Sequence, residues 1–406
     1  MSDILFLSHR IPFPPDRGDK IRSHHLLKAL AHIAPVHAAT FGETAADMAE
    51  ESALEGVAKS HLLIQRDKAL PIAGIEALLT GKPVSLTAFD DVRLREWVGR
   101  TLAEQPIRTI VVFSGQMGQY VPDDFDGRVV IDLCDVDSAK FDAYAEEGRL
   151  PRSLIDRREG RILAAEEARL ADRSNEVLLV SEAEAELFRS RLPDGSARKV
   201  SALRNGIDAH FFDPEGATSP SPFAGGAGPH LVFTGQMDYP PNVSAVQRVA
   251  ASLLPSIRQE FPDAQFHIVG RAPIDKVMRL NAVAGVKVWG EVPDVRPFIR
   301  AADAILAPLT IARGIQNKVL EAMAMARPVI VSPEAATGID ATDGIHFAVG
   351  DSDDALVKLT IATLSDGEAA KAMGVAARRY VLQNQSWEAM LAPLPALLGR
   401  EPRHVA

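Results

Sequence analysis

The segment Trp289–Ile339, WGEVPDVRPFIRAADAILAPLTIARGIQNKVLEAMAMARPVIVSPEAATGI, decides the fold. Its apolar runs predict a strand, a loop, a short helix and a second strand, and then a glycine-containing turn, a second helix and a third strand. Strands and helices that alternate in this way are typical of a parallel sheet covered by helices. We therefore expect a doubly wound α/β domain in this part of the chain.

The turn before the second helix of this segment has the composition of a phosphate site. Arg313 and Lys318 supply positive charge, and Gly314 allows a ligand to approach the backbone at a helix N-terminus. Glu321, one turn further along, is placed to accept hydrogen bonds from ribose hydroxyls. Free backbone amides add to the site at Ile315, Gln316 and Asn317. The pattern predicts a site for a nucleoside diphosphate that needs no metal.

Composition narrows the classes of protein. With 406 residues the chain is long enough for two domains, and a net charge of −10 argues against a general nucleic-acid binder. The single cysteine, Cys134, excludes an intramolecular disulfide and a cysteine-based zinc cluster. The N-terminal apolar run is only four residues long, which indicates a first strand and not a signal peptide. We expect a cytoplasmic protein.

The same alternation of strands and helices extends over both halves of the chain, with a break at a segment rich in Gly, Ser and Pro. We predict an N-terminal Rossmann-like domain over residues 1–212, a linker over 213–229 and a second Rossmann-like domain over 230–386. A C-terminal helix over 387–406 is expected to cross back to the first domain. Ligands of doubly wound sheets bind at the carboxyl ends of the strands, so we expect the two domains to face a central cleft.

Six segments together resemble one enzyme family. They are SHRIPFPPDRGDKIRSHHLLKALA from residue 8, VVIDLCDVDSAKFDAYA from 129, VLLVSEAEAELF from 177, LRNGIDAHFF from 203, LVFTGQMDYPPNVSAV from 231 and ARGIQNKVLEAMAMARPVIVS from 312. In order and spacing they resemble the retaining glycosyltransferases of the GT-B fold in family 4. Within that family, the chain is most similar to the sugar transferases of bacterial exopolysaccharide and PEP-CTERM/exosortase systems.

The resemblance implies a reaction. A sugar moves from a nucleotide-diphosphate donor, held on the C-terminal domain, to an acceptor hydroxyl held mostly on the N-terminal domain, and the anomeric configuration is retained. The implied partners are the nucleotide-sugar donor and a glycan or lipid-linked acceptor, with no nucleic acid and no further cofactor. A protein of this kind is cytoplasmic, and the alternative is one that also contacts the inner face of the plasma membrane peripherally.

The resemblance also assigns residues that bind the donor, and it reveals two positions at which this chain departs from the family pattern. Glu321 matches the second glutamate of the family motif, which binds the donor ribose, while Arg313 stands where the first glutamate is expected. Many relatives carry an arginine and a lysine after the first strand of this domain to clamp the diphosphate. This chain has Gly235 and Gln236 there and no equivalent lysine. The clamp is then expected from Arg313, Lys318 and Arg271.

On the N-terminal side, the loop after the first strand and the end of strand VVIDL carry the candidates. The loop contains Arg17, Gly18, Asp19 and Lys20, which we expect to serve the acceptor or the transferred sugar; a mobile loop entering a helix is the structural alternative. The second departure is Cys134, where relatives often have a histidine. The catalytic candidates are Asp135, Arg313 and Lys318. A metal held by Asp132, Asp135 and Asp137 is the less favoured alternative.

Two other functions remain open from the sequence. A nucleotide-sugar 2-epimerase has the same fold, and a protein that binds a nucleotide sugar without turnover would tolerate both departures. Asn242 follows two prolines and is expected to cap a helix. The arginine-rich helix after residue 152 is expected to be exposed and to form salt bridges. The alternative is a basic patch that faces a membrane.

Overall fold

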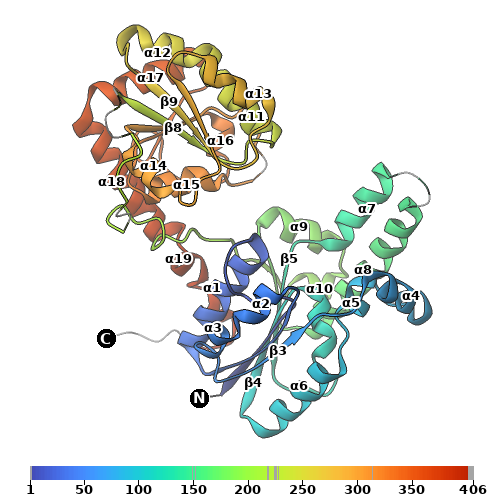
Figure 1. The fold of residues 1–406 in the computed structure, drawn as a ribbon. Helices are drawn as coiled ribbons and strands as arrows, with labels where there is room; N and C mark the ends of the chain where they lie inside the picture. Colours follow the sequence, from blue (N-terminus) through green and yellow to red (C-terminus); the bar gives the residue numbers. More distant parts are fainter. Residues whose placement is uncertain are drawn as a thin grey trace. The chain divides into compact units, whose positions relative to one another are not determined.

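The computed structural model describes residues 2–148, 150, 152–216, 219–223, 226, 228–312 and 314–400. The chain divides into two compact units, each with its own sheet (Figure 1). The first unit contains Met1–Asn205 and Met390–Ala406, and the second contains Gly206–Ala389. The segment 213–229, interpreted above as the linker, lies within the second unit, where Phe223 is buried and stacks on His267.

The sheet of the first unit has seven parallel strands in the order β3-β2-β1-β4-β5-β6-β7. Their bounds are β1 Asp3–Ser8, β2 Val36–Gly42, β3 Ser60–Gln65, β4 Ile107–Phe113, β5 Arg128–Cys134, β6 Glu176–Leu179 and β7 Val200–Ala202. Strands β1 and β2 are buried along their whole length, as expected for runs of apolar residues covered on both faces. The strand order reverses between β1 and β4, which is where doubly wound sheets bind ligands.

Helices connect these strands. They are α1 Gly18–Ile33, α2 Ala45–Ala49, α3 Glu51–Glu55, α4 Leu70–Thr80, α5 Val84–Ala88, α6 Val92–Glu104, the 3₁₀ helix η1 Gly115–Tyr120, α7 Asp137–Glu147, α8 Arg152–Arg173, α9 Glu182–Ser190 and α10 Asp194–Ala197.

The second unit repeats the design with six parallel strands in the order β10-β9-β8-β11-β12-β13. The strands are β8 His230–Thr234, β9 Gln265–Val269, β10 Val286–Gly290, β11 Ala304–Ala307, β12 Val329–Val331 and β13 Ala348–Val349. The helices are α11 Pro240–Arg248, the π-helical turn η2 Val249–Leu253, α12 Leu254–Glu260, α13 Asp275–Met278, the 3₁₀ helix η3 Arg279–Ala282, α14 Arg296–Ala301, α15 Asn317–Ala324, α16 Pro333–Ala336, α17 Asp353–Ser365 and α18 Gly367–Asn384. The prediction of two doubly wound α/β domains is confirmed.

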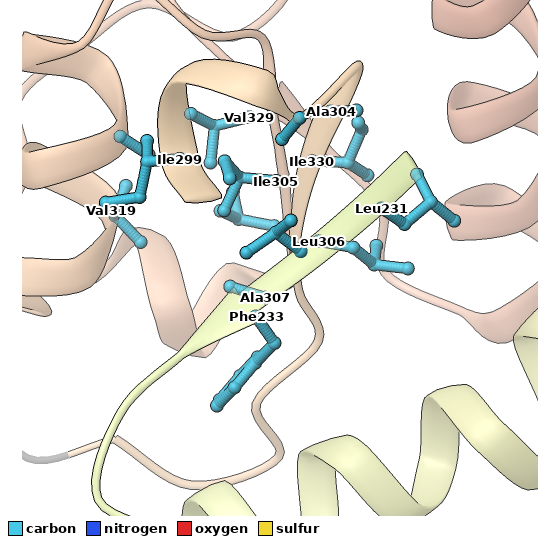
Figure 2. Close-up of a cluster of buried hydrophobic side chains, with 14 of the residues drawn as sticks. Leu231, Phe233, Ile299, Ala304, Ile305, Leu306, Ala307, Val319, Val329 and Ile330 are labelled. Atoms are coloured by element: carbon cyan, nitrogen blue, oxygen red, sulfur yellow. The ribbon is translucent and has the colours of Figure 1, made fainter. Parts of the chain in front are cut away.

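The core of the second unit fixes the helix that carries the predicted phosphate site. Figure 2 shows Val319 of α15 beside Ile299, among the buried side chains of β8, β11 and β12. On α15 the buried residues Val319, Leu320 and Met323 face this core. Lys318 and Glu321, three positions apart, therefore share a different face of the helix.

The C-terminal segment forms two short helices, α19 Trp387–Leu391 and α20 Leu394–Leu397, where one helix was expected. In the first unit, the Arg128 guanidinium donates to the carbonyl of Leu397 at 2.7 Å, and Arg400 donates to the carbonyl of Ser2 at 2.9 Å. These bonds fasten the end of the described chain to the amino ends of β5 and β1.

Candidate functional site: a cavity at the strand ends of the second unit

A cavity of about 520 Å³ lies in the second unit at the carboxyl ends of β8, β9 and β10. Three strand ends supply one wall, and α15 supplies another. The predicted residues that line it are Gly235, Gln236, Arg271, Ile315, Asn317, Lys318 and Glu321. The structure thus brings together in space most of the donor-side residues expected from the sequence, although they are up to 86 positions apart in the chain.

Two glycines form the floor of the cavity. Gly235 has a φ of +155° and Gly270 a φ of +149°, a range that side chains rarely adopt. A Cβ on Gly270 would lie 1.7 Å from the carbonyl oxygen of Gly235, and a Cβ on Gly235 would lie 2.8 Å from the Asn242 amide nitrogen. The two loops can pack this closely against each other and against Asn242 only because both positions lack a side chain.

Lys318 is held by a side chain from the opposite wall. Its Nζ donates to Asn242 Oδ1 at 2.8 Å, and Asn242 Nδ2 donates to the carbonyl of Gln236 at 2.9 Å. Asn242 is buried in the first turn of α11, whose N-cap position belongs to Tyr239. The expectation that Asn242 caps the helix is therefore wrong. Its amide is used instead to fix an ammonium beside the glycine loops.

Lys318 and Glu321 have perturbed pKa values. Burial lowers the pKa of Lys318 to about 8, and the neighbouring Glu321 carboxylate opposes the shift. Burial raises the pKa of Glu321 to about 7, and Lys318 opposes that shift. Within the described residues, the Glu321 carboxylate accepts no hydrogen bond. A partly buried carboxylate with free lone pairs is suited to accept hydrogen bonds from ligand hydroxyls.

A second cation lies at the rim. Arg271 follows the end of β9, is exposed, and donates to Gln236 Oε1 at 3.1 Å. The backbone amide of Met237 donates to the Arg271 carbonyl at 2.8 Å, which ties this loop to the one after β8. Gln236, which stands where an arginine was expected, thus orients an arginine from the neighbouring strand.

The turn before α15 is open at Gly314, but neither Gly314 nor Gln316, both expected on the donor side, lines the cavity. Gly314 has a φ of +71°, and no atom lies within 4 Å of the position of a Cβ there. Gln316 is the N-cap residue, and its side-chain amide donates to the Gly314 carbonyl at 3.1 Å. Arg313, the residue that departs most from the family pattern, lies outside the described residues.

The N-terminal candidates form a charged cluster at the end of β1. Asp19, in the first turn of α1, accepts from Arg10 at 2.6 Å and from Arg17 at 3.0 Å, and lies 3.4 Å from His9. Despite the opposing effect of burial, these partners hold the pKa of Asp19 well below its usual range, so it stays ionised. Gly18 is exposed, and space for a Cβ is open there. Within the cluster, Arg17 is exposed and accessible to a ligand, while Asp19 orients the side chains of Arg10 and Arg17.

Lys20 has a different role from the one expected. It is buried, its Nζ bonds to Asp47 at 2.5 Å, and it also donates to the Phe13 carbonyl at 3.2 Å. A buried lysine that is already paired has no free face for a ligand. The expectation that Lys20 serves the acceptor is corrected: it fixes the loop before α1 to α2.

The aspartates at the end of β5 and just after it also differ in their surroundings. Asp132 is fully buried and accepts from Arg22 Nε at 2.9 Å. Asp135 is half-buried and pairs with Lys140 at 2.9 Å, which leaves part of its carboxylate open to solvent. Among the described residues, no group of three His, Cys, Asp or Glu side chains is arranged to hold a metal ion. Asp135 and Asp137 are both partly exposed and both contact Lys140, and Asp135 stays the catalytic candidate of the first unit.

Other cavity residues were not anticipated from the sequence. Phe212, Glu291, Val292 and Val295 line the cavity beside β10. The carbonyl of Phe212 accepts from Arg378 on α18 at 3.1 Å, which positions its loop. No sequence signal marked these residues, because three of them are apolar and lie in loops.

Comparison with known proteins agrees with this geometry. Residues 228–366, which contain most of the residues that line the cavity, match the family model of the glycosyl transferases group 1. A GDP-mannose-dependent monoacylated alpha-(1-6)-phosphatidylinositol monomannoside mannosyltransferase from Corynebacterium glutamicum is 32% identical over 162 residues. That match covers 37% of this chain and 42% of the relative, so the chain matches less than half the length of this curated protein.

Solved structures share the fold of the whole chain. Anabaena Alr3699/HepE in complex with UDP has a TM-score of 0.61 at 16% identity, covering 98% of this chain and 100% of that one. A glycosyltransferase from Rickettsia africae ESF-5 gives 0.59 at 14% identity, covering 98% and 97%. WaaG, a glycosyltransferase involved in lipopolysaccharide biosynthesis, gives 0.54 at 18%, covering 98% and 100%. The fold is GT-B.

Proposed function

We propose that this protein is a retaining glycosyltransferase that binds a nucleotide-diphosphate sugar in the cavity of its second unit. The observation that carries the proposal is that Lys318 and Glu321 share one face of α15 and line the cavity together with the glycine loops after β8 and β9. A cation at a helix N-terminus beside bare backbone suits a diphosphate. A carboxylate one turn deeper suits the ribose hydroxyls.

The charges of the cavity determine what it does to the donor. When the bond between sugar and diphosphate breaks, negative charge develops on the diphosphate, and cations fixed before the reaction stabilise it most. Lys318 is fixed by Asn242, and Arg271 is oriented by Gln236. The pair replaces the arginine and lysine that are absent after β8. Arg313 is proposed as a third cation.

The step itself follows from these charges. We propose that the sugar–phosphate bond breaks as the acceptor hydroxyl attacks the same face of the sugar. The acceptor proton then passes to an oxygen of the departing diphosphate, so the configuration is retained and no protein nucleophile is needed. A related enzyme that binds UDP-glucose and a relative that uses GDP-mannose support a nucleotide-sugar donor, and both UDP and GDP are donors to test.

The first unit is proposed to serve the acceptor, with Arg17, Gly18 and Asp19 at one strand end and Asp135 at another. The proposed acceptor is a glycan or a lipid-linked saccharide in exopolysaccharide or cell-surface glycan synthesis at the cytoplasmic face of the membrane. Two similar proteins, a phosphatidylinositol monomannoside mannosyltransferase and a glycosyltransferase involved in lipopolysaccharide biosynthesis, support this class. No helix in the described part of the chain is long and apolar enough to cross a membrane.

The test is turnover with a panel of UDP-, GDP- and ADP-sugars, with and without saccharide and lipid-linked acceptors. We expect one donor to release its nucleoside diphosphate only when an acceptor is present, and NMR of the product to show the donor's anomeric configuration. A new sugar nucleotide formed from the donor alone would identify an epimerase instead. Nucleotide binding without turnover on any acceptor would identify a non-catalytic protein.

The cavity is tested in the same assay by Lys318→Met, which should lose turnover. Its matched control is Lys358→Met, which removes an exposed lysine of the same unit on α17. It should leave turnover unchanged. A loss of turnover in the control equal to that in Lys318→Met would show that any change in the charge of this unit matters, and would remove the argument for the cavity.

A further inference from the structure

Helix α4 has its large apolar side chains on the outside. Leu70, Ile72, Ile75, Leu78 and Leu79 are between 60% and 84% exposed. The residues that α4 buries are two alanines, Ala73 and Ala77. At a helical repeat of 3.6 residues, Ile75 and Leu79 lie opposite these alanines. A surface helix normally has the reverse arrangement, so this face is built to be covered by something apolar.

The inner face of α4 is well fixed, so its outer face is a stable surface. The carbonyl of Ala73 accepts from Thr87 Oγ1 of α5 at 2.9 Å, and the carbonyl of Ala77 accepts from Arg158 of α8 at 2.8 Å. Thr87 is buried beneath the helix. α4 is therefore anchored by its backbone and by small side chains, and its leucines and isoleucines are not needed for that contact.

The neighbouring part of α8 adds further apolar side chains and positive charge. Figure 1 shows α8 beside α4, and Arg158 joins them through its bond to the Ala77 carbonyl; it also donates to the carbonyl of Lys82, just after α4, at 3.4 Å. On α8, Leu154 and Ile155 are 58% and 57% exposed. Leu154, Arg157 and Arg161 follow one another at helical spacing on its exposed stripe.

Some charged side chains of this region have an ion-pair partner and others do not. Among the described residues, Lys82, Arg157 and Arg161 are exposed and form no ion pair. The acidic side chains of α4 and of the first two turns of α8 are already engaged: Glu76 pairs with Lys68 at 2.9 Å, Asp156 with Arg152 at 3.7 Å, and Glu159 with Arg158 at 2.5 Å. The surface is therefore apolar along α4 and positive at the end of α4 and along α8.

We propose that this surface, the α4 ridge with the exposed stripe of α8, docks on an anionic lipid bilayer. Leucine and isoleucine side chains enter the interface between headgroups and acyl chains, and the free cations contact lipid phosphates. The chain as a whole carries a net charge of −10, so an anionic surface repels the rest of the molecule and selects this face. A symmetric contact between two copies would bring like-charged arginines together, which disfavours a dimer as the occupant.

The inference does not depend on sugar transfer, because docking is measured without turnover. The full-length protein is mixed with vesicles of phosphatidylglycerol and phosphatidylethanolamine, or of phosphatidylcholine alone, and the bound fraction is measured by flotation. We expect binding to the anionic vesicles that weakens with added salt. Lys318→Met should bind vesicles as the wild type does, which separates this test from that of the donor site.

Two sets of substitutions locate the surface. The triple change Ile75→Ser, Leu78→Ser and Leu79→Ser removes exposed apolar groups only, and Arg157→Glu with Arg161→Glu reverses the charge without touching α4. Each set should lower the partition onto anionic vesicles at least tenfold with an unchanged melting temperature. The matched control is Val375→Ser with Leu382→Ser, which removes exposed apolar residues of the second unit and should have no effect.

The proposal would be overturned by a wild-type protein that does not float with anionic vesicles, or by binding that neither set of substitutions weakens. A wild-type dimer in light scattering that the triple variant converts to a monomer, without vesicle binding, would assign the ridge to a second copy of the chain.

Discussion

Replacement of Lys318 by methionine separates its functional role from its structural one. Methionine keeps the length of the side chain and its contact near the Phe233 ring, over which the ammonium lies at 5.2 Å, but removes the charge. If the ammonium stabilises charge developing on the leaving diphosphate, its loss should lower kcat by about 10²–10³-fold, the usual effect of removing one such donor.

The same change should be nearly neutral for stability, because two effects oppose each other. A lysine whose pKa is lowered from 10.5 to about 8 costs about 3 kcal/mol when held charged at neutral pH, and partial exposure reduces that cost. Against this, loss of the bond to Asn242 leaves a buried amide oxygen unpaired, at about 1–3 kcal/mol. The melting temperature should therefore stay within about 4 °C, since about 1 kcal/mol shifts a unit of this size by 2–4 °C.

The pH dependence of the free energy of unfolding tests the sign of the effect that the Lys318 charge has on stability. Below pH 8 the lysine is protonated in both the folded and the unfolded chain, so the destabilisation is fully present; it is lost as pH rises toward 10.5. The stability of the variant relative to the wild type should thus be greatest at neutral pH and fall above pH 8. The assays are donor turnover and calorimetric melting from pH 7 to 10.5. Wild-type turnover in the variant, or a loss of activity that simply follows unfolding, would refute the reasoning.

Three further outcomes follow from the same contacts. Affinity for the nucleoside diphosphate, measured by titration calorimetry, should be greatest between pH 7 and 8. It should fall below pH 7 because Glu321 is then protonated, and above pH 8 because Lys318 then loses its proton. Lys318→Met should abolish only the fall in affinity above pH 8. Gly270→Ala should cost roughly 2–4 kcal/mol of unfolding free energy and most donor binding, since its Cβ would meet a carbonyl at 1.7 Å; a well-folded variant that binds normally would contradict the floor described here. Lys20→Met should cost about 3–5 kcal/mol in urea unfolding, because it leaves the buried Asp47 carboxylate without its cation and with only the backbone amides of Glu43 and Thr44 as donors; a second change, Asp47→Asn, should restore much of it, and a stable single variant would return Lys20 to the candidate ligands.

The fold and half of the site were predictable for a physical reason. Buried parallel strands are continuous apolar runs, and the residues that follow them collect at one edge of the sheet. Gly235, Lys318 and Glu321 could therefore be placed in one site from the sequence.

The rest of the site depends on which side chains contact one another, and the sequence does not specify these contacts. Asn242 was assigned to a helix cap, but it lies inside the first turn and binds Lys318. Lys20 was expected to bind a ligand because the loop before it is rich in charged residues, but it is buried and forms an ion pair with Asp47. On α4 the alternation of large and small apolar residues does not reveal which set faces solvent, so the exposed ridge appears only in the structure.

The most direct test of the central claim, that the cavity of the second unit binds the nucleotide sugar, is hydrogen exchange of the protein with and without a saturating nucleoside diphosphate. The account predicts protection concentrated at residues 234–242, 269–271 and 314–321, and lost in Glu321→Ala and Lys318→Met. Protection centred elsewhere in the chain, or protection that persists unchanged in both variants, would contradict it.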